Sequence, residues 1–159
     1  MNLQRLYEYR FRDVDQSARR AVWGPIAEFV WERLGRPERV LDPAAGRCEF
    51  ISAVPAGERW AVDRVAYPEA ESEGITFMAG DATEVGLPDA HFDGVFVSNF
   101  LEHLPSPDAV SAFLERMRGF MRPGGRIAVM GPNFRYCAKE YFDCADHTVV
   151  LTQDRKSVV

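Results

Sequence analysis

The sequence lacks a hydrophobic run long enough to cross a membrane, since no stretch approaches the roughly 18 consecutive apolar residues of a spanning helix. Residues 1–13, MNLQRLYEYRFRD, contain no apolar core of the signal-peptide type. Three cysteines, an odd number, do not make a disulfide framework. These absences argue against a membrane or disulfide-built protein and predict a soluble, cytoplasmic one.

Basic residues are outnumbered by acidic ones, 19 against 24. The net charge of −5 argues against a broad surface for nucleic acid or anionic lipid. Four arginines lie close together in the sequence, and we interpret them as a solvated helix end, where cations are favourable. They are Arg116, Arg118, Arg122 and Arg126. With 159 residues, 47% of them hydrophobic, the chain predicts one globular domain with its own core.

Repeats and low-complexity segments are absent, and short β-type runs alternate with helical ones instead. Such alternation predicts an α/β domain with a mostly parallel sheet. The continuous apolar run in 92–98 is typical of a strand buried on both faces. The expected strands are residues 39–42, 59–63, 75–79, 92–98 and 126–130, and the expected helices are 14–34, 48–54 and 107–121.

The two longer helices show apolar residues at helical spacing. Gly24-Pro25 should kink or restart the first, and Gly35 should end it. Pro123-Gly124-Gly125 should break the second before the last strand. The expected buried positions are Val22, Ile26, Phe29, Val30 and Leu34 in the first helix, and Val110, Phe113, Leu114, Met117 and Met121 in the second.

Three acidic residues, Asp42, Asp63 and Asp81, follow the first three expected strands. Ligands bind outside the carboxyl ends of parallel strands, so these carboxylates should line one crevice. Asp63 lies about twenty residues beyond the first loop, where an acidic group can hold both hydroxyls of a ribose. Any one of them alone is more simply a helix or turn cap, but three in register favour a nucleoside site.

The loop in LDPAAGRCEF, residues 41–50, contains a single glycine, Gly46. A dinucleotide pattern G-x-G-x-x-G would place Glu49 where close packing requires glycine. The G-x-G-x-G pattern of S-adenosylmethionine sites falls on Ala44, Gly46 and Cys48, all small. Close backbone approach to a ligand is then possible if Ala44 and Cys48 keep negative φ, with Gly46 the one certain position of positive φ.

At this point the sequence resembles the class I S-adenosylmethionine-dependent methyltransferases, from about residue 38 to 135. VLDPAAGRCEF, WAVD and GDATEVGLPDAHFDGVFVSNFLEHL look like successive motifs of that family, and MRPGG followed by RIAVMGP matches its next loop and strand. The resemblance implies a Rossmann-like, doubly wound sheet with strand order 3-2-1-4-5. It also implies S-adenosylmethionine as cofactor, S-adenosylhomocysteine as product and a small-molecule acceptor methylated on oxygen or nitrogen.

The same resemblance assigns cofactor roles to individual residues. Asp63 would hold the ribose hydroxyls and Arg64 would flank the adenine. Asp81 would accept from the adenine amino group, and the Ala82 N–H would donate to the ring. The remaining positions are Asp42 as the acid of the first motif, Ala44, Ala45 and Gly46 under the methionine part, and Asn99 and Phe100 near the sulfonium and the substrate pocket.

Methyl transfer is an in-line displacement that requires alignment and, for some acceptors, removal of a proton. Glu102, His103 and His147 are candidate bases, with Tyr136 and Tyr141 as positioning groups. Glu-His-Leu is frequent in the resembled family, which favours a structural or cofactor-side role for His103. His147 is the better candidate, and we interpret His91 as exposed.

A zinc interpretation of the residues near the C-terminus is weaker. Thiolates and imidazole suit zinc, but the spacing C-x6-C-x2-H of Cys137, Cys144 and His147 matches no standard knuckle. Asp146 adds no obvious fourth ligand. We therefore expect no metal, and we interpret the cysteines as buried thiols in a reducing compartment.

The two ends complete the expected single domain of residues 1–159. Residues 1–37 form an N-terminal helical cap, with Tyr7 and Arg10 as cofactor contacts of a lid. Residues 38–135 form the cofactor-binding core, and 136–159 an incomplete C-terminal segment with a β-prone run at 148–152 and a helix start capped by Thr152. The family's C-terminal hairpin would be missing or truncated.

Without that hairpin, the fifth strand has an exposed apolar edge. Either the tail folds back over this edge, or two chains pair there as a homodimer, or the chain is a truncated form with impaired activity. Two other functions remain open beside methyl transfer. One is a cofactor-binding but catalytically silent partner subunit, and the other a nicotinamide-dependent oxidoreductase, which Glu49 disfavours.

Overall fold

The structure is a computed structural model that describes residues 9, 15–66 and 74–152. Its strands are β1 (Arg39–Asp42), β2 (Glu58–Asp63), β3 (Thr76–Ala79), β4 (Phe92–Ser98) and β5 (Met121–Met130). Its α-helices are α2 (Gln16–Arg33), α3 (Glu49–Ala53), α5 (Pro107–Phe120) and α6 (Phe134–Cys137), and η1 (Leu101–His103) and η2 (Tyr141–Asp143) are short 3-10 helices.

The five strands form one sheet in the order β3-β2-β1-β4-β5, and every described pair is parallel. This confirms the Rossmann-like order expected from the sequence. β1 and β4 span the residues predicted for them. The parallel arrangement brings the carboxyl ends of all five strands to one edge, which is where the functional residues are expected.

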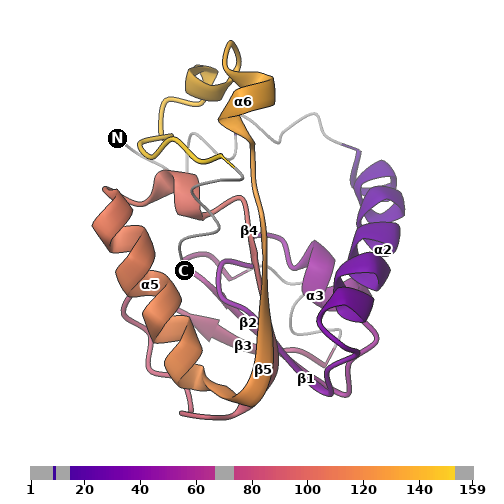
Figure 1. Ribbon diagram of the computed structural model, residues 1–159. Helices are drawn as coiled ribbons and strands as arrows, with labels where there is room; N and C mark the ends of the chain where they lie inside the picture. The colour runs from indigo at the N-terminus through magenta and orange to yellow at the C-terminus, as the bar shows by residue number, and fades with distance from the viewer. Residues whose placement is uncertain (1–8, 10–14, 67–73, 153–159) are drawn as a thin grey trace.

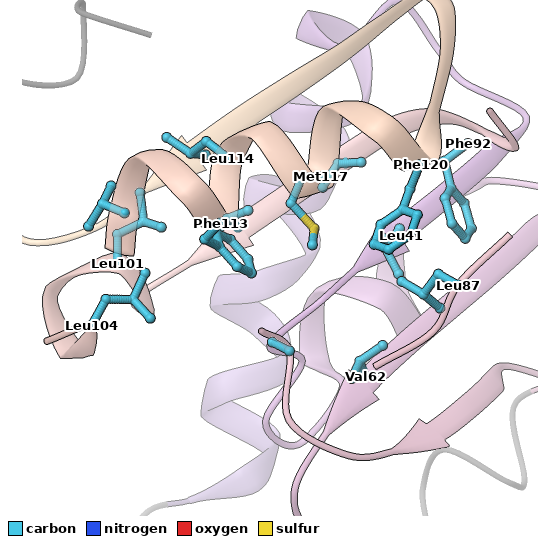
Figure 2. Packing of buried hydrophobic residues seen from close by; sticks show 14 of the residues in the cluster. Leu41, Val62, Leu87, Phe92, Leu101, Leu104, Phe113, Leu114, Met117 and Phe120 are labelled. Atoms are coloured by element: carbon cyan, nitrogen blue, oxygen red, sulfur yellow. The ribbon is translucent and has the colours of Figure 1, made fainter. Parts of the chain in front are cut away.

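Alternate residues of the central strands pack on opposite faces of the sheet. Leu41 and Val62 face a cluster formed with α5, whereas Val40 and Ala61 face a cluster formed with α2 and α3. Figure 1 shows α5 on one side of the sheet and α2 and α3 on the other. In Figure 2, Phe113, Met117 and Phe120 project from α5 into the cluster that contains Leu41, with Phe120 next to Leu41. The sheet is therefore sandwiched between helices, as the unbroken apolar run of β4 predicts.

Helix α2 differs from its prediction in two ways. It continues through Pro25 without restarting, and its buried stripe runs through Ala27, Val30 and Leu34. Val22 and Phe29, expected in the core, are 60% and 58% exposed, because positions 27, 30 and 34 face the sheet instead. The end of the helix is as predicted.

That end is a Schellman motif built on a left-handed glycine. Gly35 has φ +88°, and its N–H donates to the Glu32 carbonyl at 3.0 Å. The Arg36 N–H donates to the Trp31 carbonyl at 2.8 Å. Both bonds satisfy carbonyls that the last turn of a helix otherwise leaves open.

The turn between α5 and the last strand is tighter than predicted. β5 begins at Met121 directly after the helix, and the Pro123–Gly125 segment is absorbed by a register shift opposite Phe92 and Gly94. Arg122 and Arg126 therefore belong to a strand, which corrects their interpretation as a helix end. Arg122 pairs with Asp93 at 3.1 Å, and Arg116 reaches the carbonyls of residues 84 and 85.

The described part of the C-terminal segment folds across the carboxyl edge of the sheet, above β4 and β5 (Figure 1), and forms no strand at 148–152. Thr148 and Val149 donate their N–H groups to the Glu102 carbonyl at 2.8 and 3.1 Å. Tyr141, only 1% exposed, donates its hydroxyl to the Val149 carbonyl at 2.5 Å. These contacts replace the expected β-run, and the helix predicted after Thr152 falls outside the described residues, as do Tyr7 and Arg10.

Gly125 should tolerate no side chain. A Cβ at this position would lie 3.0 Å from the Arg122 carbonyl oxygen and 3.2 Å from those of Phe92 and Asp93, all backbone atoms. We expect Gly125→Ala to lower the free energy of unfolding by about 1–3 kcal/mol. Gly119→Ala in α5 is the matched control, because its Cβ would meet nothing within 4 Å and should stabilise by about 0.5–1 kcal/mol. Urea denaturation measures both, and equal signs would contradict the account.

Candidate functional site

The loop after β1 is fastened to the end of β2. The Ala45 N–H donates to the Val62 carbonyl at 2.9 Å, and the Gly46 N–H donates to Asp63 Oδ2 at 2.8 Å. The other carboxylate oxygen, Oδ1, accepts from the Val65 N–H at 3.0 Å, and the Asp63 carbonyl accepts from Gly80 at 2.9 Å. Asp63 thus lies where the loops after β1, β2 and β3 meet.

The Asp63 carboxylate keeps acceptor capacity for a ligand. Its oxygens accept from the backbone N–H groups of Gly46 and Val65, with a further contribution from the Arg64 N–H, whereas a carboxylate has about four lone-pair sites. Burial raises the pKa of Asp63, although the N–H groups of Val65 and Gly46 oppose the rise. Two adjacent acceptors held by backbone donors suit a vicinal diol, so the residues present fit the ribose of the implied cofactor.

The glycine-poor loop reaches its shape with two left-handed residues. Gly46 has φ +52°, as predicted, but Cys48 has φ +60° as well. The expectation of a negative φ at Cys48 is therefore wrong. A non-glycine residue in this region costs roughly 1–2 kcal/mol. Cys48 is completely buried at the start of α3, within the cluster under α2, and its packing there offsets the strain.

Asp42 plays a different role from the other two acids. It is 2% exposed, and its one hydrogen bond from the loop, from the Ala44 N–H, is long at 3.4 Å. Burial is the main cause that raises the pKa of Asp42, to about 8. The bond from Ala44 opposes this rise, and the charges of Asp63 and Glu49 add to it. This raised pKa favours the protonated form of Asp42, which is an internal group behind the loop and offers little to a ligand directly.

Asp81 and Arg64 lie together at the neighbouring strand ends and form an ion pair. Asp81 Oδ1 also accepts from the Thr83 hydroxyl at 2.7 Å and the Thr83 N–H at 2.8 Å. Burial alone would raise the pKa of Asp81, but the bonds from Thr83 and Arg64 outweigh it and lower the pKa to about 2. Asp81 is therefore ionised. Arg64 is 63% exposed at its side chain and Ala82 is buried.

The end of β4 presents Asn99 and Phe100. Asn99 is exposed with φ +47°, a left-handed conformation that asparagine tolerates, and its N–H donates to the Met130 carbonyl at 2.9 Å. The Phe100 ring packs on Phe113 of α5, with 4.9 Å between centroids. Asn99 can thus face a ligand, whereas much of Phe100 serves the core.

A second polar cluster lies just beyond, where η1 meets the C-terminal segment. Glu102 is 1% exposed, and the His103 and His147 rings lie 4.9 Å apart. His103 Nδ1 contacts Asp146 twice, at 3.2 Å to carboxylate Oδ2 and 3.1 Å to the carbonyl oxygen. Sequence reasoning missed Asp146 as the partner of His103, because no local pattern links residues 43 positions apart.

Comparison with known proteins shows the family to which the chain belongs, and the matched region includes the loop after β1. The family described as a methyltransferase domain matches residues 37–129, more than half of the chain. The chain belongs to this family. The resemblance to class I S-adenosylmethionine-dependent methyltransferases is confirmed, and the dinucleotide interpretation of the loop falls away.

Several methyltransferases are similar to this chain. A demethylmenaquinone methyltransferase of Mycobacterium sp. (strain KMS) is 34% identical over 104 residues, which cover 60% of this chain and 42% of that protein. A ubiquinone/menaquinone biosynthesis C-methyltransferase of Burkholderia cenocepacia (strain HI2424) is 33% identical over 105 residues, covering 58% and 42%. The match thus spans well under half the length of these curated relatives.

Solved structures agree with the family. The 1,6-didemethyltoxoflavin-N1-methyltransferase of Burkholderia thailandensis, crystallised with 1,6-didemethyltoxoflavin and S-adenosylhomocysteine, has a TM-score of 0.59 and 31% identity, covering 79% of this chain and 58% of that one. A Thermotoga maritima S-adenosylmethionine-dependent methyltransferase has a TM-score of 0.71 at 16% identity, covering 96% and 72%, and supports the fold alone.

The zinc site considered from the sequence, with Cys137, Cys144 and His147 as ligands, is not formed among the described residues. The Cys137 thiol donates to the Asn133 carbonyl at 3.0 Å. Among the described residues, the ligand-type side chains that do come together are Glu102, His103 and His147. None of the three cysteines forms a disulfide.

A cavity of about 570 Å³ lies away from the acidic edge. It is lined by Leu34, Gly35 and Pro37 together with Asp93 and residues 122–126 of β5. These residues lie at the amino ends of β1, β4 and β5. Ligands of doubly wound folds bind at the carboxyl ends of the strands, so this cavity has no part in the methyltransferase site.

Proposed function

We propose that this chain binds S-adenosylmethionine and transfers its methyl group to a small-molecule acceptor. One observation supports this above the others: the Asp63 carboxylate is held by the Gly46 N–H at the meeting point of three loops, with two oxygens available to a diol. Family membership and the S-adenosylhomocysteine bound to the 1,6-didemethyltoxoflavin-N1-methyltransferase support the same proposal.

The chain's own residues bind and orient the reactants. Bound S-adenosylmethionine supplies a methyl group activated by a sulfonium. Asp63 accepts from the ribose hydroxyls, and Ala44, Ala45 and Gly46 let the backbone approach the methionine part closely. Asp81 accepts from the adenine amino group while its ion pair holds Arg64 at the rim, and Ala82 donates its N–H to the ring. Asn99 and Phe100 border the reacting end.

The acceptor is proposed to be a small organic molecule methylated on oxygen or nitrogen. The curated relatives carry names that specify menaquinone precursors and carbon methylation, and the toxoflavin-type neighbour a nitrogen acceptor. These names specify small molecules, quinones among them, with an acceptor atom that differs from one protein to the next. The net charge of −5 disfavours a nucleic-acid acceptor, whose phosphates require a basic surface.

Proton removal, where the acceptor needs it, is assigned to the cluster beyond β4. His147 Nδ1 is buried and has no hydrogen-bond partner among the described residues, so no contact within the fold occupies its lone pair. His103 is less suited, since its Nδ1 is engaged by Asp146. Tyr141 packs its ring 4.8 Å from His147 and positions it.

Two measurements test the proposal in sequence. Isothermal titration calorimetry with S-adenosylhomocysteine should show saturable binding, and absence of binding at millimolar ligand would refute the cofactor site. Transfer of an isotope-labelled methyl group from S-adenosylmethionine to a panel of quinones, phenols and heterocycles then tests activity. Binding without any transfer would favour the alternative of a silent partner subunit.

We propose that the protein is cytoplasmic, in keeping with three cysteines that form no disulfide with one another. None of the helices in the described ranges is both long and apolar enough to cross a bilayer. A fusion with a fluorescent protein, followed by fractionation, tests this location. Recovery in a membrane or secreted fraction would overturn it.

We also infer that two copies pair along β5. Among the described residues β5 pairs only with β4, so one edge keeps its backbone donors and acceptors open. Ile127 on this strand is 37% exposed, and Phe29 of α2 borders an apolar groove of about 400 Å³ against Ala128 and Met130. A second copy offers the same edge, and twofold symmetry makes the contact self-complementary.

Light scattering during gel filtration should give twice the 18.0 kDa chain mass. Ile127→Lys should yield the monomer, because a charged side chain blocks pairing at a strand edge. Tyr136→Lys, at a 78% exposed position in α6, is the matched control and should remain dimeric. A wild-type protein that is monomeric at every concentration would exclude this pairing.

A further inference from the structure

Glu102, His103 and His147 bring three ligand-type side chains together. Their ligand atoms, one from each residue, all lie within 4.8 Å of one another. Glu102 and His103 come from η1, directly after β4, and His147 comes from the C-terminal segment. Three protein ligands of this kind, two imidazoles and one carboxylate, are a common donor set for zinc and other divalent transition metals.

The two segments that carry these ligands are fixed to each other by their backbones. The Glu102 carbonyl accepts from the N–H groups of Thr148 and Val149, and the Leu104 carbonyl accepts from the Thr148 hydroxyl at 2.5 Å. These bonds flank the candidate ligands on both sides. The backbone therefore holds the two ligand-bearing segments together, with the three ligand atoms within 4.8 Å of one another.

The His103 ring is oriented as a metal ligand requires. Its Nδ1 faces two oxygens of Asp146, the carboxylate Oδ2 at 3.2 Å and the carbonyl oxygen at 3.1 Å. Both are acceptors, so Nδ1 is the nitrogen that donates here, and Nε2 is the nitrogen that can face a metal ion. A carboxylate behind the distal nitrogen is the usual second-shell partner of a metal-bound histidine.

His147 supplies an independent observation. Its Nδ1 is buried and lacks a hydrogen-bond partner among the described residues, a costly state for a polar atom. The ring is held between His103 and Tyr141, with centroid distances of 4.9 and 4.8 Å. A cation bound in the cluster would satisfy this nitrogen.

Gly131, which follows β5, lies beside Glu102. A Cβ at this position would lie 3.4 Å from Glu102 Oε2, an ordinary van der Waals contact, so the glycine leaves space next to the carboxylate. Zinc bonds of about 2.0–2.1 Å place tetrahedral ligand atoms about 3.4 Å apart. The three side chains therefore need to close by roughly an ångström from their present separation.

We propose that Glu102, His103 and His147 form a binding site for a divalent transition-metal ion, with zinc as the preferred ion and Asp146 as the positioning residue behind His103. Three protein ligands leave a fourth coordination position for water or an acceptor atom. The site differs from the cysteine-based one considered from the sequence. It shares His147 with the proton-removal role proposed above, so the two roles are alternatives at that residue, and its test is metal binding alone.

The test is calorimetry of zinc sulfate with the chelator-stripped full chain. One equivalent should bind, and His103→Ala and His147→Ala should each weaken binding by more than the 10–100-fold typical of second-shell losses. Asp146→Asn should fall within that 10–100-fold range. Circular dichroism establishes that each variant is folded.

Two controls separate this site from adventitious binding. His91→Ala removes the third histidine, whose ring bonds Glu58 at 2.7 Å elsewhere in the fold, and should leave zinc affinity unchanged. Cys137→Ala with Cys144→Ala should also leave it unchanged, and a cobalt-loaded protein should show no thiolate charge-transfer band. No saturable binding, or binding that survives His147→Ala, or binding lost with the cysteines, would each overturn the proposal.

Discussion

Asp63→Asn should weaken S-adenosylhomocysteine binding by roughly 10- to 100-fold, because hydrogen bonds to a charged group contribute about 1.5–3 kcal/mol and each 1.4 kcal/mol is tenfold. The amide keeps the size of the carboxylate but loses its charge and one acceptor. In the wild type, the N–H groups of Gly46 and Val65 donate to the Asp63 carboxylate at 2.8 and 3.0 Å. The asparagine NH2 group would face one of these N–H groups, so two donors would meet and that hydrogen bond would be lost. The ribose loses an acceptor and the loop loses its anchor. Calorimetry measures the affinity.

The matched control is Asp93→Asn. Asp93 is also a partly buried carboxylate bonded to a backbone N–H, that of Arg39 at 3.1 Å, but it lies at the amino end of β4. Its substitution should leave ligand affinity unchanged within twofold. If Asp63→Asn binds as tightly as the wild type, the ribose assignment is wrong, whatever the outcome of the activity assay.

The sheet was predictable because its central strands carry buried apolar residues. The apolar run of β4 is typical of a strand covered on both faces, and the predicted bounds of β1 and β4 match the structure. The position of Asp63 followed from its distance beyond the loop, a spacing that parallel β-α-β geometry imposes. Helix α2 was harder, since helical spacing alone does not say which of two overlapping apolar stripes faces the sheet.

The chemistry of the site depends on contacts that no local pattern records. Arg64 and Asp81 were given separate adenine roles from the resemblance, yet the structure pairs them with each other across two strand ends. The contact between His103 and Asp146 joins residues 43 positions apart. The β-prone run at 148–152 forms no strand, because its N–H groups donate to the Glu102 carbonyl and the Tyr141 hydroxyl instead of to a neighbouring strand.

Asp42→Asn should stabilise the protein above about pH 4. Burial foremost raises the pKa of Asp42 from 3.8 to about 8, so the folded state favours the protonated acid. The stability that this group contributes is complete below pH 3.8 and is lost progressively as the pH rises toward 8. Neutral pH lies roughly three units into that window, and each unit is worth about 1.36 kcal/mol, so the gain from asparagine is up to about 4 kcal/mol.

Urea denaturation at several pH values measures this gain. Wild-type stability should decline between pH 4 and 8 more steeply than that of Asp42→Asn, and the two proteins should converge near pH 4. Asp93→Asn should change the stability in the opposite direction, because the pKa of Asp93 is lowered and not raised. Although burial opposes the effect, the bonds from Arg39 and Arg122 lower the pKa of Asp93, so its contribution is present above its ordinary pKa and lost only as the pH falls further. That substitution should destabilise uniformly from pH 5 to 8. Parallel pH profiles for wild type and Asp42→Asn would show that Asp42 is ionised in the folded protein, and the loop would then rest on a buried charge.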